Sequence, residues 1–454
     1  MVKKILIILF IVLILNSYLL ADESLSTIKF TRNDRVLILA PHPDDETIGT
    51  GGVIQRALEA GASVKVVCYT NGDNNELAFI VYEKRLVFKK KAFLNLGQIR
   101  AKETINAMTC LGLNKKDIIF LGYPDFGTME ILTKYWGNTK PYRSMFPRQN
   151  KVPYPEALSF GAPYLGESIL KDLKTIILDF RPTKIFVSHP ADTNKDHRSL
   201  YLFLKVALWD LEGRIRIPLV FPYIIHVIGW PKPRGYLPDL ELTPPSKLKG
   251  VSWQKFPLTG QETKKKYDAI LNYKSQIVID KPYLFTFARR NELFGDYPVI
   301  KLKKEDRKEL NWQDLNLDED IAEDSTVEEQ KKPIPISALS YAFHDNNLFI
   351  RLVLKRSIDK DFGIPIFLLG YSKKTDFALM PKIRLSIDFF GLHVREKKQP
   401  VFIKDVQLSS KGKTLIIKVP LSVLGNPERI LSYARTRIGA LAYDRSSWRI
   451  IELE

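Results

Sequence analysis

The chain is poor in cysteine: among 454 residues, only Cys68 and Cys110 carry a thiol. Neither lies in a cysteine-rich context, which argues against a cysteine-based metal module. Cys68 falls in an apolar segment typical of a buried strand, and Cys110 falls in a helical one. We therefore expect two buried free thiols; a disulfide formed after export is the alternative.

The chain is also short of acidic residues. Lysine and arginine number 69 against 51 aspartates and glutamates, which gives a formal charge of +18 and a pI near 9.5. Such a balance suits nucleic acid, an anionic glycan or a membrane surface, and it is equally typical of a generally basic proteome. Because the C₂H₂ spacing and the RNP-like aromatic motif are both missing, we expect no nucleic-acid partner.

The apolar run near the N-terminus is too short to span a bilayer. It covers residues 5–15, whereas a spanning helix needs about 20 residues. It follows Lys3 and Lys4 and precedes the small residue Ala21, a pattern that predicts a signal peptide over residues 1–21. We therefore expect an exported protein, in the periplasm, the cell envelope or outside the cell. An uncleaved anchor is the alternative, and membrane contact would then be limited to this segment.

What the chain does contain is an alternation of apolar strands and helical segments, beginning at Arg35. The expected strands cover residues 36–40, 63–70, 117–122, 184–188 and 218–227, and the expected helices cover residues 46–60, 98–111, 166–180 and 196–211. This order predicts an α/β domain, over residues 30–310, with a mostly parallel sheet and helices on both faces. Ligands of such sheets bind outside the carboxyl ends of the strands.

Two insertions interrupt this pattern, at about residues 74–96 and 127–165. The second is rich in aromatic residues, and it contains Tyr135, Trp136, Tyr142, Phe146, Tyr154, Phe160 and Tyr164. Aromatic loops at a strand-end site can stack on sugar rings, or they can simply pack the loops together.

The composition changes beyond residue 310. Residues 311–335 are acidic and end in a proline-containing stretch, which predicts a solvated linker. Short strand-like segments follow at residues 348–354, 382–387 and 414–419, separated by turn signals and without a helical period. Residues 336–454 are therefore expected to form an all-β sandwich.

Two polar clusters follow expected strands. Residues 41–46 read Pro-His-Pro-Asp-Asp-Glu, and residues 189–197 read His-Pro-Ala-Asp-Thr-Asn-Lys-Asp-His. A hydrolytic zinc site needs about three protein ligands and an open position for water, whose pKa the metal lowers. His42 and Asp45 can face one point from a strand-end turn, and His197 can complete the set. Asp44 would then be free to take the proton of the attacking water.

A simpler interpretation exists for each cluster alone. A lone His-Pro or Asp-Asp pair usually belongs to a loop or a helix cap, and Asp196 could be only a helix N-cap. Two such clusters at matching strand ends favour the metal site.

The two clusters resemble the PIG-L/LmbE-like family of zinc-dependent de-N-acetylases. The resemblance runs from about residue 35 to 197 and continues more weakly at residues 273–276 and 292–294. It rests on residues 41–46, 70–73 (Thr-Asn-Gly-Asp), Arg100 with Glu103, 121–125 (Leu-Gly-Tyr-Pro-Asp) and the pair Asp196-His197.

The resemblance implies a Rossmann-like deacetylase with one Zn²⁺ ion. By position, the resemblance implies that His42, Asp45 and His197 are the zinc ligands and that Asp44 is the general base. It also implies that Asp196 orients the metal site and that Arg100 and Asp125 contact the sugar. An ordinary helix ion pair between Arg100 and Glu103 is the alternative for the arginine.

One position departs from the family pattern. Many relatives carry a further histidine two residues before the Asp-His pair, and here that residue is Asn194. An asparagine amide can donate a hydrogen bond to an oxyanion, but it cannot act as a general acid. His189 could replace the missing group only if its loop folded back.

The C-terminal region faintly resembles carbohydrate-binding sandwich modules, at residues 415–425 and 444–449. A structural or protein-binding role is the alternative, in which Trp448 belongs to the core. Together these observations predict an exported zinc-dependent deacetylase of N-acetylated amino sugars, with a GlcNAc-type glycan or glycoconjugate as its partner. Two alternatives stay open: a non-catalytic, metal-containing glycan-binding protein, and an amidase acting on a non-sugar amide.

Overall fold

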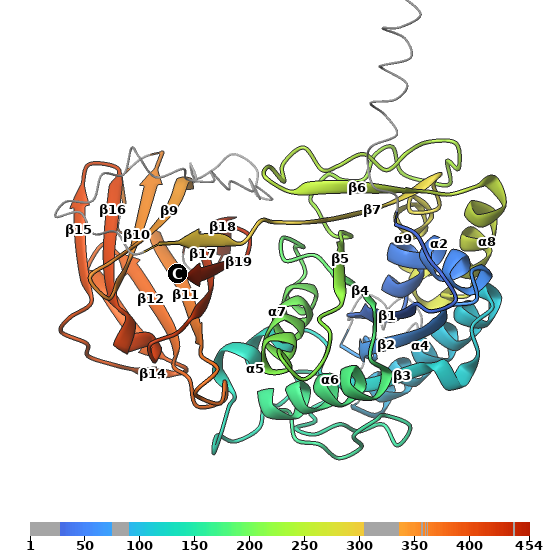
Figure 1. Ribbon diagram of the computed structural model, residues 1–454, viewed down its shortest axis with the longest axis horizontal. Coiled ribbons are helices and arrows are strands. Elements are labelled where there is room, and N and C mark those ends of the chain that lie inside the picture. Colours follow the sequence, from blue (N-terminus) through green and yellow to red (C-terminus); the bar gives the residue numbers. More distant parts are fainter. Residues whose placement is uncertain are drawn as a thin grey trace, which may run out of the picture.

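The computed structural model describes residues 28–74, 90–303, 336–438 except 356, 359 and 361, and 441–454. The expected signal peptide and acidic linker lie outside these residues. Figure 1 shows two parts side by side: an α/β part, and a β-sandwich formed by the C-terminal segment. Within the described ranges, none of the helices is long and apolar enough to cross a membrane.

A seven-stranded sheet forms the centre of the α/β part. Its strands are β1 (Arg35–Ala40), β2 (Ser63–Thr70), β3 (Ile118–Tyr123), β4 (Lys184–Ser188), β5 (Leu219–Tyr223), β6 (Ser252–Pro257) and β7 (Asn291–Asp296). The spatial order is β3-β2-β1-β4-β5-β7-β6. The first five of these strands run parallel to one another, and β7 pairs antiparallel with both β5 and β6. The strand order reverses between β1 and β4, so their carboxyl ends border the crevice where such sheets bind ligands.

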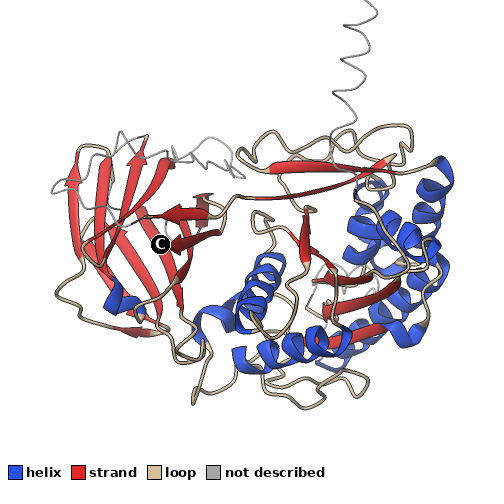
Figure 2. Cartoon of the chain, in the orientation of Figure 1, coloured by secondary structure: helices blue, strands red, loops and turns tan. Residues whose placement is uncertain are grey.

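Helices cover both faces of this sheet, as Figure 2 shows. They are α2 (Asp45–Glu59), α4 (Lys90–Leu111), η1 (Lys115–Asp117), α5 (Thr128–Lys134), α6 (Gly166–Phe180), α7 (Lys195–Asp210), α8 (Gly260–Ile270) and α9 (Lys274–Phe285). In β1, Leu37 and Leu39 pack into the core beneath α6 and α7, whereas Val36 and Ile38 pack into the core beneath α2 and α4. Both faces are therefore buried, which explains why β1 is continuously apolar and confirms the expected mostly parallel sheet.

The C-terminal part is a sandwich of two antiparallel sheets, as the sequence predicts. Its strands are β9 (Ile336–His344), β10 (Asn347–Leu354), β11 (Phe362–Tyr371), β12 (Lys382–Asp388), β13 (Gly391–Glu396), β14 (Gln399–Pro400), β15 (Gln407–Lys411), β16 (Thr414–Pro420), β17 (Arg429–Ile438), β18 (Leu441–Arg445) and β19 (Arg449–Leu453), with the short helix η2 (Leu421–Leu424). One sheet has the order β15-β16-β10-β9, and the other runs from β14 through β12, β11 and β17 to β19. Alternate apolar side chains of both sheets fill the space between them.

The structure differs from the expected domain boundary at one strand. β8 (Ile300–Leu302) lies inside the range expected for the first domain, yet it pairs with β19 in the second sheet of the sandwich. The chain therefore joins the sandwich before residue 310.

The two parts share one continuous apolar core. Trp448 is 3% exposed and stacks on Tyr433, with ring centroids 5.1 Å apart. Trp209 on α7 packs against Tyr371 of β11, at 5.0 Å between centroids. Trp448 is thus a core residue, as one of the two sequence-based interpretations has it.

Both cysteines are free thiols, as expected. Cys68 is buried in β2, whereas Cys110 at the end of α4 is only half-buried. Of the insertion aromatics, Trp136, Tyr154 and Tyr164 are fully buried and pack the loop, while Phe160 is 61% exposed.

Candidate metal centre

The metal centre is built by two loops at the carboxyl ends of β1 and β4. The first loop, residues 41–44, leads directly into α2, and its Pro41 carbonyl accepts hydrogen bonds from the backbone and hydroxyl of Thr70 on the neighbouring strand. The second loop, residues 189–194, leads into α7, which carries His197 in its first turn. Segments about 150 residues apart in the sequence therefore meet at the point where the strand order reverses.

Three ligand atoms form a nearly equilateral triangle. His42 Nδ1 lies 3.2 Å from Asp45 Oδ2. His197 Nε2 lies 3.1 Å from the same oxygen and 3.2 Å from His42 Nδ1. A tetrahedral ion with bonds of about 2.0–2.1 Å separates its ligand atoms by roughly 3.4 Å. The donor set, two imidazole nitrogens and one carboxylate oxygen, and its spacing therefore fit a divalent metal ion such as zinc.

The outward-facing nitrogen of each histidine lies against carboxylates. His42 Nε2 is 3.2 Å from Asp125 Oδ1 and 3.4 Å from Asp196 Oδ2. His197 Nδ1 is 3.1 Å from Asp192 Oδ2. When the outer nitrogen of each histidine carries a proton that faces these carboxylates, the inner nitrogens are left as lone-pair donors toward the centre of the triangle. Such carboxylate–histidine pairs fix the tautomer and raise the basicity of a metal-bound imidazole.

The electrostatics of the site favour a bound cation. Burial lowers the pKa of His197, but the carboxylates of Asp192 and Asp45 outweigh it and raise the pKa to about 9. Burial raises the pKa of Asp45, and the two histidines outweigh it, so that this pKa lies well below its usual range. These pKa directions show that the buried site favours positive charge, which a divalent ion supplies when it replaces the imidazole protons.

Asp44 has a strained backbone and a carboxylate that does not cap its helix. Its φ of +118° lies in a region that non-glycine residues rarely adopt, and such strain is concentrated at functional sites. Asp44 occupies the N-cap position of α2, but in the described structure its side chain makes no capping hydrogen bond. Burial and the neighbouring Asp45 raise its pKa, while Arg100, 3.6 Å away, opposes them. The geometry therefore keeps a carboxylate beside the candidate metal ligands, in contact with Arg100 and not used in helix capping.

Asp196 lies where a positioning residue is expected. Besides facing His42, its carboxylate accepts hydrogen bonds from the backbone amides of Phe126 and Thr128, and from the Thr128 hydroxyl. The N-cap of α7 is Asn194 and not Asp196, because Asn194 Oδ1 accepts the Asp196 amide hydrogen bond at 2.8 Å. The alternative that Asp196 is only a cap is therefore wrong. The catalytic role of Asn194 stays a prediction, and its side-chain oxygen is already used in capping.

The two expected sugar-contacting residues are both deeply buried. Arg100 donates hydrogen bonds to the carbonyls of Pro43 and Gly72, so it braces the loop that carries His42. The alternative Arg100–Glu103 ion pair is not formed in the described structure, because Glu103 accepts instead from the amide and hydroxyl of Ser275. Asp125 is 2% exposed and faces His42. Sugar contacts by Arg100 and Asp125 stay predictions.

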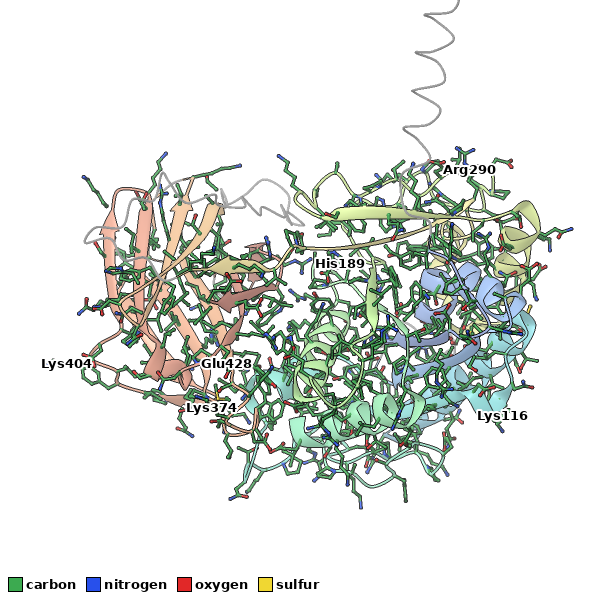
Figure 3. All side chains as sticks on the ribbon, in the orientation of Figure 1. Lys116, His189, Arg290, Lys374, Lys404 and Glu428 are labelled. Carbon is green, nitrogen blue, oxygen red and sulfur yellow. The ribbon has the colours of Figure 1, made fainter. Side chains whose placement is uncertain are left out.

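Sequence reasoning assigned no role to Asp192 and missed His226. The His226 ring lies 4.8 Å from that of His197, and its Nδ1 is 3.1 Å from the Tyr283 hydroxyl. His226 lies three residues beyond the end of β5, whereas the expected strand reached residue 227, so the strand-end rule did not point to it. His189 takes no part in the centre: it stacks on Trp253 at 5.4 Å, and Figure 3 shows it where the two parts of the molecule meet.

Comparisons with known proteins agree with this chemistry. The profile of the family described as PIG-L, GlcNAc-PI de-N-acetylase, matches residues 37–208. A 1D-myo-inositol 2-acetamido-2-deoxy-alpha-D-glucopyranoside deacetylase of Rhodococcus jostii is 37% identical over 81 residues, which is 18% of this chain and 27% of the relative. The corresponding deacetylase of a Mycobacterium species (strain KMS) is 37% identical over 90 residues, 20% of this chain and 28% of the relative.

The chain thus spans only about a quarter of the length of these curated relatives. Among solved structures, the N,N'-diacetylchitobiose deacetylase of Pyrococcus horikoshii is 20% identical and is covered over 84% of its chain and 58% of this one, with a TM-score of 0.35.

Proposed function

Because the chain contains a PIG-L family domain at residues 37–208, we propose that it is an exported, zinc-dependent deacetylase that hydrolyses the acetamide of N-acetylated amino sugars. The observation that carries the proposal is the triangle of His42 Nδ1, Asp45 Oδ2 and His197 Nε2 beside an Asp44 carboxylate that makes no capping hydrogen bond. The names of the relatives, which are deacetylases of an acetamido sugar, support the substrate class.

When bound, the divalent ion supplies a Lewis acid that activates water and polarises the acetamide carbonyl. Asp44 accepts one proton as the water oxygen bonds to the carbonyl carbon, and it returns that proton to the nitrogen as the C–N bond breaks. This proton transfer yields acetic acid and the amine, and the remaining acid proton then moves to the amine to give acetate and an ammonium group. Atoms and charges therefore balance with one base alone. Arg100 holds the loop of Asp44 in place through the Pro43 carbonyl and keeps the carboxylate oriented.

A single carboxylate shuttling the proton is consistent with Asn194 at the position where many family members have histidine. Asn194 is also what favours the second candidate, a metal-containing protein that binds glycans without turning them over. Glycan binding without turnover would not explain the strained backbone of Asp44, so the catalytic proposal is preferred.

Acetate release from N-acetylglucosamine oligomers by the zinc-loaded full chain tests the proposal. We expect release by the parent and a loss of about 10²–10⁴-fold in Asp44→Asn, which keeps the size of the side chain but removes the base. Asp172→Asn, a buried carboxylate on α6 that accepts from Tyr123 and Ser159, is the matched control and should stay active. If the parent binds one metal per chain but releases no acetate from any N-acetylated glycan, the binding protein is the better explanation.

Metal identity and export need their own measurements. Elemental analysis of the chain purified without added metal should find zinc in place of iron, manganese or nickel. Fractionation of cells that express the full chain, followed by sequencing of its N-terminus, should find it outside the cytoplasm and separate a cleaved signal from a retained anchor.

A further inference from the structure

The outer face of the sandwich carries a cluster of arginines. Along β17, Ala434 points into the sandwich core, whereas Tyr433, Arg435 and Arg437 point to the opposite face. Arg384 on β12 lies on the same face and directly opposite Arg395 of β13. Figure 1 shows β17 and β18 on the side of the sandwich that is nearest to the α/β part.

The strand between these arginines leaves room for them. β11 separates β12 from β17, and on this face it presents Gly363, Pro365 and Phe367. The Arg437 guanidinium lies across Gly363, where an added Cβ would come within 2.9 Å of its Nε. The Arg384 guanidinium lies 5.6 Å from the centre of the Phe367 ring. The guanidinium groups therefore lie over a shallow apolar floor.

Three of these arginines lack a carboxylate partner. Within the described residues, no ion pair involves Arg384, Arg395 or Arg435. Glu130, the acidic side chain that acts on Arg384, is itself paired with Lys134. Burial lowers the pKa of Arg384, and the charges of Arg435, Arg395 and Arg437 lower it further, opposed by Glu130. Like charges so close together are stabilised when an anion lies among them.

This face borders the metal centre. Arg445, opposite Arg435 in the sheet, donates a hydrogen bond to the carbonyl of Thr193, the residue before the N-cap of α7. Arg198, on α7 next to His197, has its guanidinium 5.2 Å from the Tyr433 ring centre. α5 begins at Thr128, whose backbone amide donates a hydrogen bond to Asp196. The same helix carries Glu130, whose charge raises the pKa of Arg384. A glycan chain lying on the arginine face can therefore extend toward the metal centre.

We infer that Arg384, Arg395 and Arg435 form a binding site for the anionic groups of a glycan, and that the glycan processed at the metal centre is negatively charged along its chain. This inference rests on the proposed deacetylase function. Guanidinium groups suit this task, because their planar N–H donors bind carboxylate or phosphate oxygens in pairs.

Binding of matched oligosaccharides to the full chain tests the inference. The two probes are hyaluronan oligosaccharides, in which N-acetylglucosamine alternates with an acidic sugar, and neutral chitin oligomers of the same length. We expect the parent to bind the acidic probe at least about tenfold more tightly at low salt, and salt to remove this preference. Arg384→Gln/Arg435→Gln should lose the preference, and so in part should Arg395→Gln, whose exposed side chain can be changed without disturbing the fold.

Arg214→Gln/Arg216→Gln is the matched control, because it removes the same charge from exposed positions that precede the amino end of β5, whereas the metal centre lies at the carboxyl ends of the strands. It should bind both probes as the parent does. Equal affinities of the parent for the two probes, or an equal loss in the control, would overturn the inference. Inorganic triphosphate as a competitor distinguishes phosphate from carboxylate as the preferred group. Binding to anionic lipid vesicles without any binding of the acidic glycan would overturn it in favour of a membrane surface.

The outcomes separate this inference from the proposed function. Acetate release from chitin oligomers with no charge preference would leave the deacetylase and reject the arginine site. Charge-selective binding without acetate release from either probe would keep the site and reject the enzyme.

Discussion

The strongest test of the metal centre is the replacement Asp192→Asn. Asp192 is fully buried, and its Oδ2 lies 3.1 Å from His197 Nδ1. The same oxygen accepts the amide of His226 at 2.9 Å, and Oδ1 accepts the amide of Asn194 at 2.8 Å. The carboxylate therefore receives donors on both oxygens. Asparagine preserves its shape, but it removes the charge and turns one acceptor into a donor.

The expected effect is a weaker metal site. Loss of a carboxylate that supports a metal-bound histidine typically costs 10–100-fold in metal affinity, which corresponds to about 1.4–2.8 kcal/mol. The variant should also differ from the parent in the pH dependence of its metal binding. Because Asp192 helps to raise the pKa of His197 to about 9, the variant should also show a weaker pH dependence of metal binding, as fewer protons are displaced near neutral pH.

Competition between the full chain and a chromophoric zinc chelator measures the dissociation constant at several pH values. Asp172→Asn removes a buried carboxylate of similar exposure whose hydrogen-bond partners are Tyr123 and Ser159 and not the candidate ligands, and it should leave the dissociation constant unchanged. An Asp192→Asn protein that melts like its parent and binds zinc within about twofold of it would refute the assignment of His197 Nε2 as a ligand oriented by Asp192.

Three further predictions concern stability. Burial raises the pKa of Asp73 to about 7, although the hydrogen bond from Tyr154 opposes this shift. The folded state therefore binds more protons than the unfolded state between about pH 4 and 7, and the free energy of unfolding falls as the pH rises through this window. In urea unfolding, the stability of Asp73→Asn relative to the parent should increase by about 2–3 kcal/mol between pH 5 and pH 8. A pH-independent difference would contradict this. Trp448→Ala should lower the free energy of unfolding by about 3–5 kcal/mol because it empties the shared core, and a cost below about 1 kcal/mol would argue against one core. Gly52→Ala should cost about 1–3 kcal/mol, since its Cβ would lie 2.1 Å from a Leu258 methyl; an unchanged melting temperature would contradict the packing.

The α/β pattern could be predicted well where one physical signal dominated. β1, β2 and β4 are apolar because both faces of the sheet are covered, and α6 begins and ends where its apolar period does. The rule that ligands bind at strand ends led to His42, Asp45 and His197, which the structure brings together.

Residues 252–302 gave no such signal. The buried side of α8 contains Thr263 and Lys266, so its apolar period is weak; Lys266 is tolerated inside because it pairs with Glu292 at 2.7 Å. α9 is interrupted at Asp280 and contains Pro282, which hides its helical character in the sequence. His226 was missed because a single histidine after β5 has no neighbouring motif, and only the fold shows that this strand end lies beside that of β4.

The shared core changes how the C-terminal part should be understood. An aromatic side chain that stacks on a sugar ring has to be exposed to solvent. Here Tyr433 and Trp448 are buried against α7 and the loop before it, and Trp448 donates its backbone amide toward the Pro190 carbonyl at 3.5 Å. The loop that leads to His197 is therefore packed between the sheet and the sandwich, and its geometry depends on both. The sandwich therefore packs against one of the two loops that build the candidate metal centre, and the proposed arginine site lies next to this contact.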